Sequence, residues 1–249
     1  MSAIVTKTEI ENGLRRLGVE AGMMLEVHCS LGSFGHVEGG ALTVIDALKR
    51  MVGTEGAIVM PSFKDSLNIP LDEEDRQLGL TLKIKLLSGE EERSGMGIVS
   101  DTFRSMLDVK TGEGQFRVSA WGKEAEQHAA NWFHHLIASG GYALLLGVDI
   151  YKMSSMHAVE EHLPDEIKAL FRPSDEALKR YPESEWFIEA WDPPAKPWHT
   201  IQAKAYEMGY INDIMIGGSR CMLVQINNVL HLYRQELQNN PFELYGLIE

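Results

Sequence analysis

One histidine and two carboxylates lie close together in the segment SSMHAVEEH, at a spacing that could serve proton transfer. If this segment forms a helix, His157, Glu160 and Glu161 share one face, because residues three and four positions apart are neighbours on a helix surface. A histidine beside a carboxylate suits a general base, since the acid orients the imidazole and makes it more basic. An ordinary surface pair of histidine and glutamate is the simpler alternative.

The same residues could instead bind a metal ion. His157 and a neighbouring glutamate would supply two ligands of a zinc ion. Candidates for a third ligand are His199 and His28. The chain lacks a complete HExxH motif, the usual helical zinc signature, which weakens the metal interpretation.

A glycine-rich stretch from Ser30 to Ala41 could hold a phosphate group. Small residues let the backbone approach a ligand, and the N-terminus of a following helix offers free N–H groups and the positive end of a dipole. The stretch matches neither a Walker sequence nor a GxGxxG fingerprint. The alternative is a turn that only connects a strand to a helix.

Three tryptophans and two carboxylates form a further candidate region, comprising Trp186, Trp191, Trp198, Glu189 and Asp192. Aromatic rings and carboxylates together can hold a cation through cation–π and ionic contacts. Glu189 and Asp192 are therefore candidate substrate-binding residues for a cationic ligand. The alternative is that this segment packs a loop onto the core.

The first sixty residues alternate strand and helix patterns in the way that is typical of an α/β fold. Apolar residues at helical spacing predict a helix over 7–17, with Thr8 and Glu11 as its capping box. A buried strand is expected over 23–30, and the glycine-rich loop follows it. A glycine-rich turn at the C-terminal end of a parallel strand is where open α/β sheets usually bind ligands.

Hydrophobic patterns predict the remaining elements. His134 and His135 are adjacent and cannot share a helix face, so we expect them at the surface and at the rim of the core. The predicted elements are a helix over 42–52, a strand over 56–63, a helix over 96–107 capped by Ser100 or Asp101, a strand over 116–122, one helix over 123–139, a strand over 142–149 and a C-terminal helix over 223–237.

Two segments have a different character. Residues 64–94 contain the acidic clusters Asp72–Asp75 and Glu90–Glu92, and we expect a surface excursion around a short amphipathic element. Prolines interrupt residues 163–200, which we expect to be rich in loops. Together with Glu189 and Asp192, the acidic clusters are predicted to form a negative field on the side of the substrate.

The net charge of the chain limits the classes of molecule that it is expected to bind. The 249 residues include 36 acidic and 23 basic side chains, for a formal net charge of -13. This surplus repels phosphate backbones and anionic membranes, and favours cationic small molecules. The two cysteines are expected to be free thiols in a reducing compartment, and no signal or membrane-spanning run is apparent, so we expect a cytoplasmic protein.

Four segments, taken in order, resemble the aminoglycoside 3-N-acetyltransferase family: LEVHCSLGSFGHVEGGALTVIDALKRMVGTEGAIVMPSF, GIVSDTFRSM, VSAWGKEAEQ and LLLGVDIYKMSSMHAVEE. The stretch GYINDIMIGGSRCMLVQINNVL resembles the family more loosely. The resemblance implies an acetyl-CoA-dependent N-acetyltransferase that acts on an amino group of an aminoglycoside, with the 3-N position expected, or on a related cationic amine. Pattern and resemblance together predict one α/β domain over 1–249. It would be a three-layer sandwich with a mostly parallel or mixed central sheet flanked by helices, plus a loop-rich C-terminal portion.

By resemblance, His157 would be the general base with Glu160 beside it, no metal would be bound, and loop N–H groups would stabilise the oxyanion. Direct transfer is expected, because neither cysteine falls where the family has a nucleophile. Whether the chain is a monomer or a homodimer stays open. The residues that would contact coenzyme A are Ser30, Leu31, Gly32, Ser33, Phe34, Gly35, Gly39, Gly40, Ala41, Ser62 and Ser119.

Two differences from the family concern the acceptor side. Family members usually carry Arg-Ser-x-His-Pro before the strand that matches VSAWG, whereas this chain has Glu113 or Gly114 where the histidine would fall. Much of the family's loop between KEAEQ and LLLGVD is also absent. The alternatives are a metal-dependent hydrolase that uses His157 and Glu160, and a non-catalytic coenzyme A-binding homologue.

Overall fold

The computed structural model describes residues 4–88, 93–193 and 195–248, so Glu90–Glu92 lie outside the described residues. Its centre is a seven-stranded sheet in the order β10-β11-β8-β2-β4-β7-β6. The three central strands β8, β2 and β4 are parallel, and the outer pairings are antiparallel. The strands are β2 (Met24–Cys29), β4 (Ala57–Pro61), β6 (Lys110–Thr111), β7 (Val118–Gly122), β8 (Tyr142–Leu146), β10 (Ile211–Ile216) and β11 (Ser219–Gln225).

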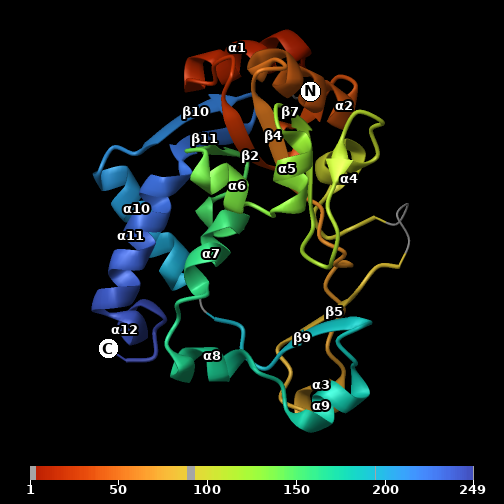
Figure 1. Ribbon diagram of the computed structural model, residues 1–249, viewed down its shortest axis with the longest axis vertical. Coiled ribbons are helices and arrows are strands. Elements are labelled where there is room, and N and C mark those ends of the chain that lie inside the picture. Colours follow the sequence, from red (N-terminus) through yellow and green to blue (C-terminus); the bar gives the residue numbers. More distant parts are fainter. Residues whose placement is uncertain (1–3, 89–92, 194, 249) are drawn as a thin grey trace.

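Helices cover both faces of this sheet, which confirms the predicted three-layer α/β arrangement (Figure 1). On one face, α1 (Lys7–Leu17), α2 (Gly40–Val52) and α4 (Ile98–Arg104) share a core with Leu25 and Val27 of β2. On the other face the core includes residues of α5 (Ala125–Ala130), α6 (His134–Ala138), α7 (His157–Glu160), α10 (Lys196–Glu207), α11 (Ile226–Asn239) and α12 (Pro241–Leu244). Because strand side chains alternate, Glu26 and His28 face the layer that contains α7.

The carboxyl ends of β2, β4 and β8 meet at one edge of the sheet, because these strands are parallel. After β2 the chain forms the short 3-10 helix η1 (Leu31–Phe34) and the strand β3 (His36–Val37), which pairs with β1 (Ile4–Val5). After β8 the chain forms η2 (Ile150–Lys152), η3 (Ser154–Met156) and then α7. The sheet therefore brings the glycine-rich loop and the His157 segment to the same edge.

A small lobe lies at the bottom of Figure 1 and contains parts of two segments distinguished in the sequence, the surface excursion over 64–94 and the loop-rich segment over 163–200. These segments join through the antiparallel pair of β5 (Leu82–Lys85) and β9 (Trp186–Glu189). Three more helices lie in this part of the chain: α3 (Glu73–Gln77), α8 (Asp165–Phe171) and α9 (Asp175–Arg180). The lobe has a core of its own, built from Leu80, Ala177, Tyr181 and Ile188.

The acidic cluster Asp72–Asp75 stabilises this lobe. Asp72 caps α3 by accepting a hydrogen bond from the Asp75 backbone N–H. Asp75 is fully buried, where its carboxylate pairs with Lys83 and accepts a hydrogen bond of 2.5 Å from the Tyr181 hydroxyl. Burial disfavours the charged form of Asp75, but these hydrogen bonds and the Lys83 charge outweigh burial and lower its pKa to about 2. Asp72 and Asp75 thus have structural partners, contrary to their predicted role in a substrate field.

Two predicted helix caps are wrong. Helix α1 is capped by Thr6 and Glu9, and not by Thr8 and Glu11. The same Thr-x-x-Glu spacing occurs twice, and the extended backbone at Thr6 after β1 decides the start. Helix α4 begins after Gly97, and Asp101 accepts hydrogen bonds from the backbone and side chain of Ser94.

Two further predicted helices also have different limits. The segment 123–139 forms two short helices, because the backbone at Trp132 has a φ of 48° and turns the chain between α5 and α6. Residues 223–225, expected to be helical, end strand β11, where they pair with β8, and α11 starts only at Ile226. In the part of the chain that the structure describes, no helix is sufficiently long and apolar to span a bilayer.

Candidate active site

His157 opens α7 and forms a close pair with Glu160. The imidazole Nδ1 lies 2.5 Å from Glu160 Oε2, and the two side chains are 57% and 18% exposed. The i, i+3 spacing predicted from the sequence places both groups on one helix face. Because Glu160 engages Nδ1, the Nε2 atom is the ring nitrogen available to a ligand.

Two buried tyrosines hold Glu160 from behind. The Tyr233 hydroxyl on α11 donates to Glu160 Oε1 at 3.3 Å, and lies 2.5 Å from the hydroxyl of Tyr245. Burial raises the pKa of both tyrosines, so both remain neutral donors. No local pattern indicates this pair, because it lies more than seventy residues after Glu160 and only the packing of α11 on α7 brings it close.

A second pair of side chains holds the turn that leads to His157. On β2, Glu26 is fully buried, and its Oε1 lies 2.7 Å from His28 Nε2. The Ser155 backbone N–H donates to Glu26 at 3.0 Å, and the Ser154 N–H lies 3.3 Å from His28 Nε2. His28, predicted as a third zinc ligand, therefore belongs to the support of η3.

The electrostatics of the site favour a charged histidine. Partial desolvation opposes protonation of His157, although its side chain is more than half exposed. The hydrogen bond to Glu160 and the negative charges of Glu160, Glu26 and Glu189 outweigh this effect and raise the pKa of His157. Burial, together with the charges of Asp192 and Glu160, raises the pKa of Glu189 to about 7, although the His157 charge opposes this. Glu189 thus lies within electrostatic range of the pair, and Asp192 lies within range of Glu189.

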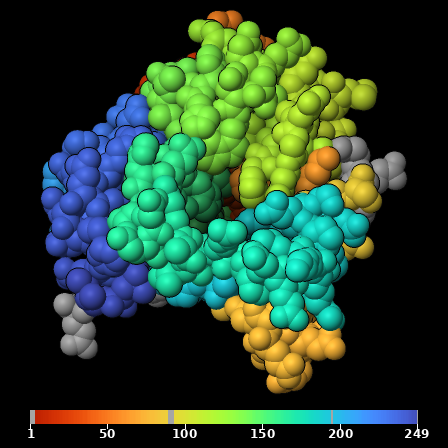
Figure 2. Space-filling model, turned by 60° about the horizontal axis from the view of Figure 1, so that its bottom comes forward, coloured from red at the N-terminus to blue at the C-terminus, as the bar shows by residue number. Residues whose placement is uncertain are grey.

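Strand β9 brings Glu189 to this site from the small lobe. In Figure 2 the surface is hollowed near the centre of the face, between the green segment around α7, the yellow-green segment and the cyan segment that includes β9. Trp186 and Trp191 pack on Tyr181 and Phe171, with ring centroids 5.1 and 5.0 Å apart. The rings of Trp186 and Trp191 therefore pack against residues of the lobe and of α8, which is the structural alternative to holding a cation.

The glycine-rich loop is anchored from both sides. Ser33 Oγ donates to the Ser30 carbonyl at 2.7 Å and lies 2.8 Å from Ser219 Oγ. Phe34 is buried and fixes η1 to the core beneath α2. Gly147, which follows β8, leaves room for this loop, since a Cβ there would lie 1.7 Å from Ser33 Oγ.

The N-terminus of α2 is open for an anion. Gly39 is its N-cap in the left-handed region with a φ of 74°, and no side chain caps the helix. The first N–H groups of a 13-residue helix are thus left to water or a ligand. Gly40 has a φ of 62°, and Ala41 packs into the core. Leu31, Gly32 and Gly35 complete the loop, and this geometry fits the predicted phosphate cradle.

Two predicted contacts of the cofactor arm are buried. Ser62 Oγ and Ser119 Oγ lie 2.6 Å apart, and Ser119 Oγ also lies 2.8 Å from Thr111 Oγ1. Both serines are at the same sheet edge as the loop, but their hydroxyls are already paired with each other. They are placed to join β4 to β7.

Several sequence candidates lie apart from this arrangement. Glu161 is exposed next to Glu160, and His199 is exposed on α10. Glu113 and Gly114, where the family histidine would fall, form an exposed turn. Among the described residues, the group of three potential metal ligands is Glu124, His128 and His135, which does not include His157. The hydrolase alternative therefore has no third ligand beside His157 in the described part of the chain.

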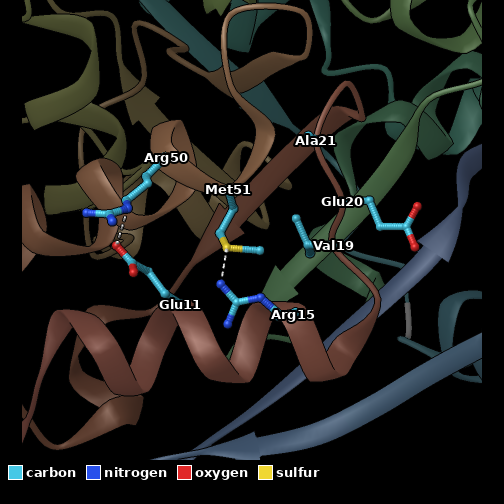
Figure 3. A pocket seen from close by; sticks show the side chains of 7 residues that line it. All are labelled: Glu11, Arg15, Val19, Glu20, Ala21, Arg50 and Met51. Carbon is cyan, nitrogen blue, oxygen red and sulfur yellow. Dashed lines mark hydrogen bonds and ion pairs between the residues drawn. The ribbon is translucent and has the colours of Figure 1, made fainter.

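A surface groove between α1 and α2 is separate from this site. Figure 3 shows its lining, with Arg15 pointing to the Met51 sulfur and Glu11 paired with Arg50 at 3.6 Å. None of the predicted site residues lines it. The edge with His157 and the glycine-rich loop is the candidate active site.

Comparison with known proteins bears on this site. The model of the aminoglycoside 3-N-acetyltransferase family matches residues 27–238. The chain belongs to this family. The match covers both the glycine-rich loop and the segment with His157 and Glu160.

Two relatives show how far the similarity extends. The SPbeta prophage-derived aminoglycoside N(3')-acetyltransferase-like protein YokD of Bacillus subtilis is 34% identical over 179 residues, which are 64% of this chain and 66% of that protein. Aminoglycoside N(3)-acetyltransferase IV of a Salmonella species is 31% identical over 165 residues, 62% of this chain and 58% of that protein. The matched part of the chain thus spans less than two thirds of the length of each.

Solved structures share the fold over nearly the whole chain. The apoenzyme of aminoglycoside acetyltransferase AAC(3)-IVa superposes with a TM-score of 0.73 at 22% identity, covering 98% of this chain and 92% of that one. AAC-IIIb, solved as a binary complex with CoASH, superposes with a TM-score of 0.69 at 16% identity, covering 99% and 100%. These similarities confirm the three-layer architecture.

Proposed function

We propose that this protein transfers the acetyl group of acetyl-CoA to an amino group of an aminoglycoside, at the 3-N position, or of a related cationic amine. The observation that carries the proposal is the pair of His157 and Glu160 at the sheet edge that also holds the glycine-rich loop. Membership of the family and the ligands of relatives support it, since AAC-IIIb was solved with CoASH and a variant of AAC(3)-IVa with apramycin. The protein would work in the cytoplasm, where acetyl-CoA is made.

The anionic end of coenzyme A would lie at the N-terminus of α2, whose uncapped N–H groups suit phosphate oxygens. The loop from Ser30 to Gly35 would line the pantetheine arm. Of the predicted contacts, Ser62 and Ser119 would shape this edge through their mutual hydrogen bond. Loop N–H groups would stabilise the oxyanion that forms on the thioester carbonyl.

The acceptor would enter from the side of the small lobe. Glu189 and Asp192 supply negative charge there, which favours a polycationic substrate. An ammonium group cannot attack a thioester, so it must lose a proton first. Neutral His157 would take this proton at Nε2 while Glu160 holds Nδ1.

The chemistry is a direct transfer. The neutral amine nitrogen forms a bond to the acetyl carbonyl carbon, and the carbon–sulfur bond breaks. His157 passes the proton that it took to the coenzyme A thiolate, and the second proton of the attacking nitrogen leaves to water as the neutral amide forms. A cysteine acyl-enzyme is disfavoured, because burial raises the pKa of Cys29 to about 12 and that of Cys221 to about 11. Both thiols therefore stay protonated near neutral pH.

A thiol-release assay over a panel of aminoglycosides tests this function. Wild type should release coenzyme A with at least one aminoglycoside, and His157→Ala should lower turnover by about 10²- to 10⁴-fold with coenzyme A affinity retained. His162→Ala, which alters a histidine outside the pair, is the matched control and should keep full turnover. Coenzyme A binding without thiol release from any aminoglycoside would instead indicate a non-catalytic binding protein.

A further inference from the structure

A cluster of potential metal ligands lies at the corner between α5 and α6, outside the candidate active site. It consists of Glu124, His128 and His135, and one ligand atom from each lies within 4.8 Å of the others. From the sequence, His135 was expected only at the surface or at the rim of the core.

His128 is the unusual member. Its side chain is fully buried, and neither Nδ1 nor Nε2 has a hydrogen-bond partner. A buried polar group without a partner costs about 1–3 kcal/mol, so it needs an explanation. Burial disfavours the charged form of an imidazole, and the neutral ring keeps a lone pair on one nitrogen for a metal.

The other two groups converge on His128. His135 Nε2 lies 2.8 Å from Glu124 Oε2, and the rings of His128 and His135 are 4.6 Å apart at an angle of 66°. Glu124 lies one helical turn before His128, and the Glu124 carbonyl accepts the His128 backbone N–H. The left-handed turn at Trp132 brings α6 back toward α5 and so places His135 against this face.

The cluster is open to solvent on one side. Glu124 is 42% exposed and His135 is 29% exposed, whereas His128 forms the buried floor. Glu124 also lines a surface pocket with Asp108, Lys110 and Trp121. A metal ion can therefore approach Glu124 and His135 from solvent, whereas contact with a His128 ring nitrogen needs a side-chain movement, because both ring nitrogens are buried.

We propose that Glu124, His128 and His135 form a binding site for a divalent transition metal of the zinc class. Two imidazole nitrogens and one carboxylate oxygen are a usual donor set for Zn²⁺, whereas Mg²⁺ and Ca²⁺ select oxygen ligands. Three protein ligands leave one coordination position for water. Binding replaces the hydrogen bond between His135 and Glu124, supplies the missing partner of His128, and links α5 to α6.

Titration calorimetry with ZnCl₂ on tag-free protein treated with EDTA tests this site. Wild type should bind one equivalent, with MgCl₂ giving no heat, and Co²⁺ should give the visible absorption band of a tetrahedral complex. His128→Gln and His135→Gln should each weaken the site by more than about 10- to 100-fold, the effect of losing even an outer partner of a metal ligand. His135→Gln should fold even if His128→Gln does not, because the His135 side chain is only partly buried.

The adjacent histidine provides the matched control. His134 is exposed on the same helix and outside the cluster, so His134→Gln should bind Zn²⁺ like wild type. Saturating Zn²⁺ should also raise the Tm of wild type by about 5–10 °C, and not that of His135→Gln. Equal zinc affinity of wild type and His135→Gln, or equal loss in His134→Gln, would overturn the proposal. The test is independent of acetyl transfer.

Discussion

At the residue scale, the proposed proton transfer to His157 depends on how this side chain is charged and held. Its Nδ1 is engaged by Glu160, which Tyr233 holds in turn from α11. The negative groups around the ring raise its pKa, so the neutral form, which can accept a proton, dominates only at higher pH. The positioning of His157 therefore also sets the pH range in which it can act.

Glu160→Gln should separate the effect of Glu160 on the pKa of His157 from its effect on the position of the ring. Turnover of wild type should rise with pH through the raised pKa of His157, because only the neutral ring acts as a base. Removing the Glu160 charge lowers that pKa, so the rising limb should move to lower pH, and maximal turnover should fall because the ring is held less firmly. The pH profile of kcat measures both, with Glu161→Gln as the control. An unchanged limb in Glu160→Gln would remove Glu160 from this role.

Glu189 should make acceptor binding depend on pH. With a pKa of about 7, it is protonated below pH 7 and loses the charge that attracts a cation. Binding of an aminoglycoside should strengthen by up to about 10-fold between pH 6 and pH 8, relative to Glu189→Gln at the same pH, since the ionised fraction rises by that factor. Calorimetric Kd values measure this difference. Glu185→Gln, on the same lobe, should retain the pH dependence, and parallel curves for wild type and Glu189→Gln would contradict the assignment.

At the element scale, the junction of the glycine-rich loop with the end of β8 is the tightest contact of the proposed coenzyme A site. Gly147 has a φ of 71°, and a Cβ there would meet Ser33 and Ser219 at 1.7 and 2.6 Å. Ser33 in turn bonds to Ser30 at the start of the loop. A side chain at Gly147 must therefore move the loop.

Gly147→Ala should weaken coenzyme A binding by at least about 10-fold, because displacement of a positioning element by about 1 Å can cost up to about 10²-fold. Gly140→Ala is the matched control, since Gly140 has a φ of 72° and nothing within 4 Å of an added Cβ. Both variants carry the same backbone strain, but only Gly147→Ala carries the clash. Equal Kd values for coenzyme A in the two variants would show that the loop does not bind it.

At the scale of the whole molecule, the small lobe has its own core, apart from the two clusters that cover the sheet. The proposed coenzyme A site lies on the main sheet, whereas Glu189 lies on β9 of the lobe. In the proposed function, the donor and acceptor sides would thus be built on different parts of the molecule. A substitution that destabilises the lobe should therefore weaken binding of the acceptor and leave binding of coenzyme A unchanged.

Asp75→Asn tests this division. Breaking the buried pair with Lys83 costs about 3–5 kcal/mol of lobe stability, because it leaves a buried charge uncompensated. The acceptor KM should rise, while the Kd for coenzyme A stays within about twofold of wild type. Glu74→Gln is the control, because its pair with Arg180 is exposed and such pairs contribute about 0–1 kcal/mol. If Asp75→Asn weakened binding of the acceptor and of coenzyme A by the same factor, the lobe and the sheet would form one unit.

The sequence by itself determined the features that depend on neighbouring residues. The central strands, α2 and the glycine-rich loop were predicted because hydrophobic period and glycine position are local signals. The pair of His157 and Glu160 was predicted because i, i+3 spacing on a helix needs no other element. The first residue of α1 could not be decided even from local signals, because two Thr-x-x-Glu spacings could each form the capping box.

The tertiary structure decided what depends on residues far apart in the chain. The lobe forms because β5 pairs with β9 about one hundred residues later, a pairing that local patterns do not specify. Tyr233 reaches Glu160, and Glu26 reaches Ser155, only because helices pack on the sheet. The corner at Trp132 breaks a helix that local propensity favours. Packing energy is shared among distant residues, and so these positions could be found only in the folded molecule.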